Sequence, residues 1–120
     1  MQYLVLIYSE ETPRADAEAI AETMQAYNAY TNMLRDTGHY VSGEALQPTS
    51  TATTVRIRDG RTMTTDGPFA ETKETLGGFY LIEAKDLDEA LQLGAACPGA
   101  RYGSIEVRPI VDFSAGQVPG

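Results

Sequence analysis

The sequence predicts an α+β sandwich, with two helices covering one face of an antiparallel sheet. Short apolar runs alternate with segments whose apolar residues recur every three or four positions, as in a helix packed on a sheet. A helical segment lies between two strand segments in each half of the chain, and a hairpin pattern separates the halves. No linker or low-complexity stretch interrupts this order, which predicts a single domain over residues 1–120.

The first half contains a strand, a helix and a second strand. Residues 2–8 (QYLVLIY) are apolar at successive positions, which indicates a central strand with both faces buried. From Asp16 the apolar spacing becomes helical, and Gly38 is well placed to end that helix. Residues 40–46 form the second strand.

A hairpin follows. Residues 53–58 (TTVRIR) alternate between two faces, Asp59-Gly60 is a strong hairpin turn, and residues 61–65 return as the partner strand. The second half then repeats the pattern, with a strand at 79–84, a helix that begins after Asp86, and a last strand at 104–110.

The segment TTDGPFAETKETLGG (64–78) connects the hairpin to the second half. Asp66-Gly67-Pro68 predicts a turn, since Asp bonds to nearby backbone N–H groups and Pro fixes φ. Residues 70–76 are expected to form about two turns of helix, ended by Gly77-Gly78 as a left-handed cap. Phe69 is expected to pin the segment to the core.

This element order is that of a ferredoxin-like βαβ…βαβ sandwich with an inserted hairpin. Nothing in the sequence covers the second face of the sheet, although its strands are apolar on both sides. An uncovered apolar face predicts a partner, and the simplest partner is a second copy related by a two-fold axis.

Composition excludes several classes of function. A net charge of −8 opposes binding to nucleic acid or to an anionic membrane surface, both of which need basic residues. The N-terminal apolar run is too short to span a bilayer and lacks the features of a signal peptide, so a cytoplasmic location is expected. Cys97 is the one cysteine, either a small buried hydrophobe or a reactive thiol. Motifs for metal or nucleotide binding are absent, and no cofactor is expected.

Several blocks together resemble the YCII-related family, in its DGPF-motif branch: LVLIY (4–8), TATTVR (51–56), DGPFAETKE (66–74), GGFY (77–80) and EVRP (106–109). The resemblance implies a ferredoxin-like fold that dimerises into an α/β barrel. It also implies that most members have no established activity, that a few act in ring-degradation chemistry, and that some are associated with extracytoplasmic-function sigma factors. Members of the wider family carry a His on the first helix, paired with an Asp. Tyr27 stands at that position here, so this acid/base couple is not carried over.

The candidate site residues surround the connecting segment. Asp66 is the candidate general base, with turn capping as the alternative. Glu71, Lys73 and Glu74, with Phe69, are expected to rim a pocket, or else to form a solvated connector.

Other candidates lie on the strands and at the first helix end. Arg56, Glu106 and Arg108 could bind an anionic ligand inside a dimeric barrel, or could satisfy one another as ion pairs. Tyr80, like Tyr27, offers a hydroxyl to a ligand or packs in the core. His39 is a weaker acid/base candidate, and its alternative role is to complement the helix dipole.

Two functions remain open from the sequence. The first is a small dimeric protein that binds a cyclic or aromatic acid near the DGPF segment, with acid/base chemistry of the lyase or isomerase type. The second is a non-catalytic module that engages a regulatory protein such as a sigma factor. The two differ in whether the protein contains an open pocket or one filled by side chains.

Overall fold

The computed structural model describes residues 1–11 and 16–118 of the chain. The elements are β1 (Gln2–Ser9), α1 (Ala17–Asp36), β2 (Tyr40–Ala45), β3 (Thr53–Arg58), β4 (Arg61–Asp66), β5 (Thr75–Glu83), α2 (Leu87–Ala95) and β6 (Ser104–Pro109), with short 3-10 turns at Thr49–Thr51, Pro98–Arg101 and Phe113–Ala115.

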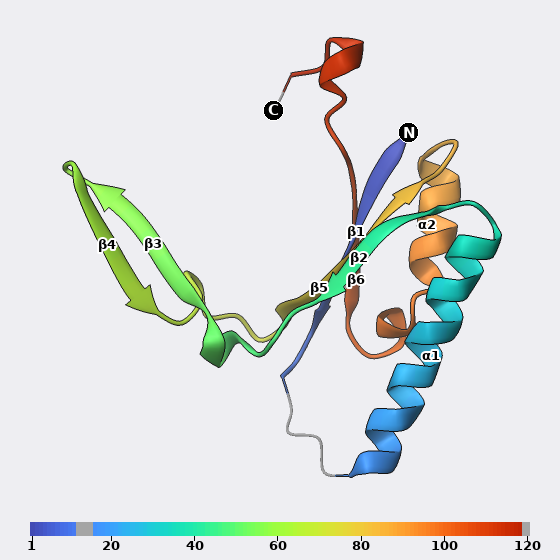
Figure 1. The fold of residues 1–120 in the computed structure, drawn as a ribbon, viewed down its shortest axis with the longest axis horizontal. Coiled ribbons are helices and arrows are strands. Elements are labelled where there is room, and N and C mark those ends of the chain that lie inside the picture. Colours follow the sequence, from blue (N-terminus) through green and yellow to red (C-terminus); the bar gives the residue numbers. More distant parts are fainter. Residues whose placement is uncertain (12–15, 119–120) are drawn as a thin grey trace.

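Four strands form one antiparallel sheet in the order β2-β5-β1-β6. The predicted central position of β1 is therefore confirmed, since it pairs with β5 on one side and β6 on the other. Both helices lie on the same side of this sheet (Figure 1). The α+β, ferredoxin-like architecture predicted from the sequence is thus confirmed.

The main core lies between the sheet and the helices. Tyr3, Val5 and Ile7 of β1 are buried there, and the register places Tyr80 and Ile82 of β5 beside them. Two buried residues of α1, Tyr30 and Leu34, complete the core on the helix side. At about 25 cal/mol per Å² of apolar surface, each fully buried side chain of this size contributes roughly 1.5–3 kcal/mol to folding.

Local sequence determines the helix ends. The carboxylate of Asp16 accepts a hydrogen bond from the Ala19 N–H at 2.6 Å and caps α1. Gly38 adopts φ = 78° after the last turn, as predicted. Asp86 caps α2 by accepting from the Glu89 N–H at 2.9 Å, while Glu89 accepts from the Lys85 N–H.

The segment from Gly67 to Glu74 contains no helix, so the helix predicted at 70–76 is wrong. Strand β5 begins at Thr75, and Gly77-Gly78 lies inside it rather than in a left-handed cap. The register jumps from Ile7↔Gly78 to Tyr8↔Leu76, which makes Gly77 the extra residue of a β-bulge. Glycine pairs occur in bulges and in helix caps, and local sequence alone does not separate them.

Strands β3 and β4 form a separate two-stranded sheet, which we call the arm (residues 53–66). The predicted turn at Asp59-Gly60 is confirmed, with φ values of 52° and 73°. The arm leaves the body on the side of the sheet opposite the helices and diverges from it (Figure 1). The hairpin therefore does not extend the main sheet.

One face of the main sheet is not covered by a helix. Leu4, Leu6 and Tyr8 of β1 point to it, because they alternate with the core residues Tyr3, Val5 and Ile7, and the register places Phe79 and Leu81 beside them. Leu6 is 9% exposed yet lies outside the core cluster on the helix side. We call this surface the open face. Its apolar character agrees with the sequence expectation.

Among the residues that the structure describes, no helix is both long and apolar enough to cross a membrane.

Candidate functional site

A pocket of about 560 Å³ lies between α1 and the strands β2 and β5. We call it the tyrosine pocket, because four tyrosines on separate elements line it. Its lining consists of Ile7, Ser9, Thr23, Met24, Tyr27, Asn28, Thr31, Tyr40, Gly43, Glu44, Ala45, Gly77, Gly78, Phe79, Tyr80 and Tyr102. This volume lies within the range of small-molecule sites in proteins, and aromatic walls with a few hydroxyl groups are typical of such sites.

The wall of the tyrosine pocket is held rigid by contacts of Tyr80. The hydroxyl groups of Tyr80 and Thr31 are 2.8 Å apart and share a hydrogen bond. The Tyr80 ring meets Tyr30 edge-on at a centroid distance of 5.1 Å and Tyr40 at 6.4 Å. Gly43 keeps the space beside this ring open, since a Cβ there would lie 2.8 Å from the ring.

Burial keeps the phenols of Tyr27 and Tyr80 neutral. Burial raises the pKa of Tyr27, and its contacts with Cys97 and Tyr102 raise that pKa further. Burial also raises the pKa of Tyr80, although its hydrogen bond with Thr31 opposes this shift. At neutral pH these hydroxyls therefore donate and accept hydrogen bonds, and do not act as phenolate bases.

Cys97 belongs to the buried core next to Tyr27. It is 1% exposed, and burial raises the pKa of its thiol. Of the two sequence interpretations, the small buried hydrophobe therefore fits its surroundings.

A second pocket of about 520 Å³, which we call the loop pocket, lies where the arm joins the body. It is lined by Tyr8, Leu46, Gln47, Pro48, Thr49, Thr51, Ala52, Pro68, Phe69, Ala70, Thr72, Thr75 and Leu76. Pro68, Phe69 and Ala70 of the DGPF segment thus do border a hollow. None of its lining residues is charged, so its polar groups are the Tyr8 and threonine hydroxyls, one amide and the backbone.

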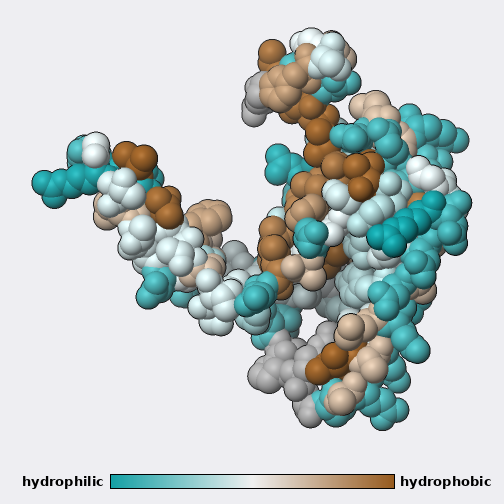
Figure 2. Space-filling model, viewed as in Figure 1, coloured by the Kyte–Doolittle hydropathy of each residue, from teal (hydrophilic) through white to brown (hydrophobic). Residues whose placement is uncertain are grey.

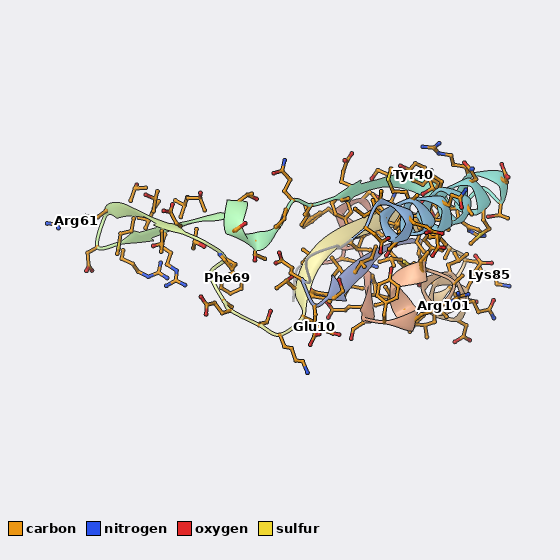
Figure 3. The ribbon with its side chains drawn as sticks, turned by 90° about the horizontal axis from the view of Figure 1, so that it is seen from below. Glu10, Tyr40, Arg61, Phe69, Lys85 and Arg101 are labelled. Carbon is orange, nitrogen blue, oxygen red and sulfur yellow. The ribbon has the colours of Figure 1, made fainter. Side chains whose placement is uncertain are left out.

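Phe69 does not pin the segment to the core, and that expectation is wrong. Its side chain is 80% exposed, and it stands at the junction of arm and body (Figure 3). The segment is held instead by backbone and hydroxyl bonds. The Gly67 N–H donates to the Ala52 carbonyl at 2.7 Å, and the Thr54 hydroxyl donates to the Gly67 carbonyl at 2.8 Å.

Asp66 is the last residue of β4, where it faces Thr53 across the arm. Its side chain is exposed and lines neither pocket, and it has no hydrogen bond to another residue of the described ranges. Glu71 is likewise exposed.

The other charged residues of the segment contact the body. Lys73 Nζ lies 3.4 Å from Glu10 Oε1 in an exposed ion pair, which contributes at most about 1 kcal/mol. Glu74 Oε1 accepts a hydrogen bond from the Ser104 hydroxyl at 2.7 Å. These two bonds attach the segment to the ends of β1 and β6, and neither side chain lines a pocket.

Within one chain, Arg56 lies on a different sheet from Glu106 and Arg108. Glu106 and Arg108 lie exposed on the open face, opposite Leu6 and Leu4 of β1. Glu106 Oε1 is 3.5 Å from the Tyr8 hydroxyl. Arg56 lies on the arm, opposite Met63.

His39 joins the end of α1 to the sheet. Its backbone N–H donates to the Leu34 carbonyl at 2.8 Å, and its Nδ1 is 2.7 Å from the Glu83 carbonyl oxygen. Glu89 Oε1 lies 3.8 Å from the same nitrogen. His39 lies outside both pockets.

Of the predicted ligand residues, the structure therefore brings Tyr80 to the tyrosine pocket and Phe69 to the loop pocket. Tyr40 and Tyr102 were missed, because they approach Tyr27 and Tyr80 only through the tertiary fold. The one sequence feature that pointed to a tyrosine-lined pocket was the aromatic composition, with seven tyrosines and no tryptophan. Across the described ranges, no three His, Cys, Asp or Glu side chains are grouped so as to hold a metal ion.

The fold and pockets define a small α+β protein with one bare sheet face and a ligand-sized pocket between helix and sheet. The model of the YCII-related domain matches residues 1–114, and the chain belongs to this family. An uncharacterized protein of Rhizobium meliloti (strain 1021) is 39% identical over 123 residues, which cover 99% of each chain. The family resemblance is thereby confirmed, while the activity of the family is not established.

Proposed function

We propose that the protein binds a small cyclic or aromatic compound in the tyrosine pocket. The observation that carries this proposal is an open cavity of about 560 Å³ with aromatic walls. A module whose only role is to contact another protein needs no such cavity, because its interior would be filled at ordinary packing density.

The lining indicates the chemistry of the ligand. Tyrosine rings and Met24 offer stacking and apolar contact, while neutral hydroxyls of Tyr27, Tyr80 and Thr31 offer hydrogen bonds. No Lys, Arg or His is among the lining residues, so a ring with hydroxyl or carbonyl groups fits better than a free carboxylate. The proposed function is binding without an acid/base reaction, since Asp66 and His39 line neither pocket.

We also propose that the protein is a homodimer joined through the open face. Leu4, Phe79 and Leu81 are only partly buried there, and a second copy would remove them from water. The tyrosine pocket lies on the helix side of the sheet, so ligand binding and dimerisation can be tested separately.

A thermal-shift screen of phenols, cyclic ketones and aromatic acids would test the ligand proposal. We expect ligands that raise the Tm of the wild-type protein, followed by calorimetric titration of the best one. Tyr80→Phe removes the hydroxyl and should weaken binding about tenfold, the equivalent of one hydrogen bond of about 1.4 kcal/mol.

Phe69→Ala in the loop pocket is the matched control and should leave the affinity unchanged. Loss of binding in Phe69→Ala with none in Tyr80→Phe would place the ligand beside the DGPF segment and overturn the assignment to the tyrosine pocket. No stabilising ligand in the whole panel would contradict the proposed chemistry.

A further inference from the structure

The arm has almost no contact with the rest of its own subunit. Every residue of β3 and β4 except Thr54 is exposed, and the large apolar side chains Val55, Ile57 and Met63 are 61%, 65% and 52% exposed. A two-stranded hairpin by itself is marginally stable in water. The arm therefore needs a surface to cover it.

The two faces of the arm differ in chemistry. The register places Val55 opposite Thr64 and Ile57 opposite Thr62, which gives one face of aliphatic and threonine side chains. Arg56 lies on the other face with Met63. The first face is uncharged except for Asp66, which is paired with Thr53 at the base of the arm, and the second face carries the arginines. A ribbon that lies on a surface has this pattern, with an apolar strip on one face.

The position of the arm indicates where that surface is. The arm extends from the body on the side of the open face, and Arg61 lies at its far tip (Figures 1 and 3). Apolar side chains gather along the border of the body that faces the arm, and the arm itself carries apolar side chains (Figure 2). A second copy that covers the open face would therefore come within reach of the arm.

Charge favours the same partner. Three arginines against two aspartates give the arm a net charge of +1, whereas the whole chain carries −8, so the rest of the chain carries −9. The open face itself carries both Glu106 and Arg108, and Glu44 of β2 faces Phe79 beside them. A basic ribbon on an acidic body steers two copies together.

We propose that the arm is an exchanged clasp: in the homodimer, each arm lies against the partner subunit, with Val55 and Ile57 on its apolar surface. This inference depends on the homodimer proposed above. It adds that residues 53–66 are part of the interface and that each subunit is completed by the arm of the other.

Hydrogen exchange at varied protein concentration tests the clasp in the full-length chain. As dilution shifts the dimer to monomer, measured in parallel by sedimentation, amides of residues 53–66 should lose protection in proportion. A dimer whose arm amides exchange equally fast at every concentration would overturn the clasp and leave the homodimer standing. A chain that stays monomeric at all concentrations would overturn both.

A variant pair gives a second readout. Val55→Ser combined with Ile57→Ser should raise the dimer dissociation constant at least about tenfold, because both apolar contacts are lost. Met63→Ser, on the other face of the same arm, is the control and should change the constant by less than about threefold. Equal effects of the two variants, or an arm that becomes protected only when a different protein is added, would contradict the proposed contact.

Discussion

A single hydrogen bond from the hydroxyl of Tyr30 links the two helices. The hydroxyl donates to the carbonyl of Leu93 at 2.7 Å inside the core, and the Tyr30 side chain is 4% exposed. A buried carbonyl that loses its donor keeps the cost of desolvation, so the bond matters more than an exposed one would.

Tyr30→Phe should therefore lower the free energy of unfolding by about 1–2 kcal/mol, measured by urea denaturation. Tyr3→Phe is the matched control, because Tyr3 is 2% exposed but the one hydrogen bond of its hydroxyl within the described residues is a weak one to the Met1 sulfur, at 3.8 Å. We expect its effect to be smaller than that of Tyr30→Phe. Similar losses in both variants would show that the helix–helix bond has no special weight.

Sequence predicts residues well where their partners are near in the chain. Gly38 and Asp86 act within three or four residues, so turn and cap chemistry alone located them. Tyr30 and Leu93 are 63 positions apart, and Thr31 and Tyr80 are 49 apart. Nothing in local spacing indicates such pairs, which is why the tyrosine pocket was not predicted as a unit.

The carboxylate of Glu11, shortly after the end of β1, links three elements through hydrogen bonds. It accepts from the Thr49 N–H at 3.1 and 3.2 Å and from the Thr75 hydroxyl at 3.1 Å. It thus ties the end of β1 to the 3-10 turn at Thr49–Thr51 and to the start of β5. The hydrogen bonds from Thr49 lower the pKa of Glu11 below its ordinary value of 4.5.

A lowered pKa in the folded state means that Glu11 stabilises the fold when it is ionised. This contribution is complete above pH 4.5 and is lost as the pH falls through the lower, folded-state pKa. Stability curves of the wild type and Glu11→Gln should therefore differ at pH 7 and converge in acid. A difference that persists at acid pH would contradict this role.

Secondary structure was predictable from apolar periodicity but not at glycine pairs. Leu76 and Gly78 both pair with β1, and the bulge at Gly77 carries the strand past its neighbour. The sequence LGG fits a helix end or a bulged strand equally well, and the pairing strand decides between them. Phe69 is likewise exposed to solvent rather than buried in the core, which depends on tertiary packing and not on local sequence.

The shape of the whole molecule follows from a sheet with only one covered side. The chain measures 49 × 48 × 19 Å, and its radius of gyration of 16.7 Å exceeds the roughly 14 Å expected of a compact domain of this length. The fold class was predictable from element order, whereas the divergence of the arm was not. Hairpin patterning determines that two strands pair, but not whether they join a larger sheet.

Leu81→Glu on the open face should convert the proposed dimer to monomer, measured by sedimentation. The reason is that Leu81 lies opposite Leu4 at the centre of the face, where a second copy would bury the new carboxylate. Leu87→Glu is the control, since Leu87 is 47% exposed on α2 and lies on the helix side. Unchanged mass in Leu81→Glu, with the fold verified by circular dichroism, would argue against this interface.

The buried thiol of Cys97 has a practical consequence. Because it is the one cysteine of the chain and is 1% exposed, a cysteine introduced on the surface could be labelled with a fluorophore while the native thiol stays unreacted. The slow modification of Cys97 itself would then time how often the region between α2 and Pro98–Arg101 opens to reagent.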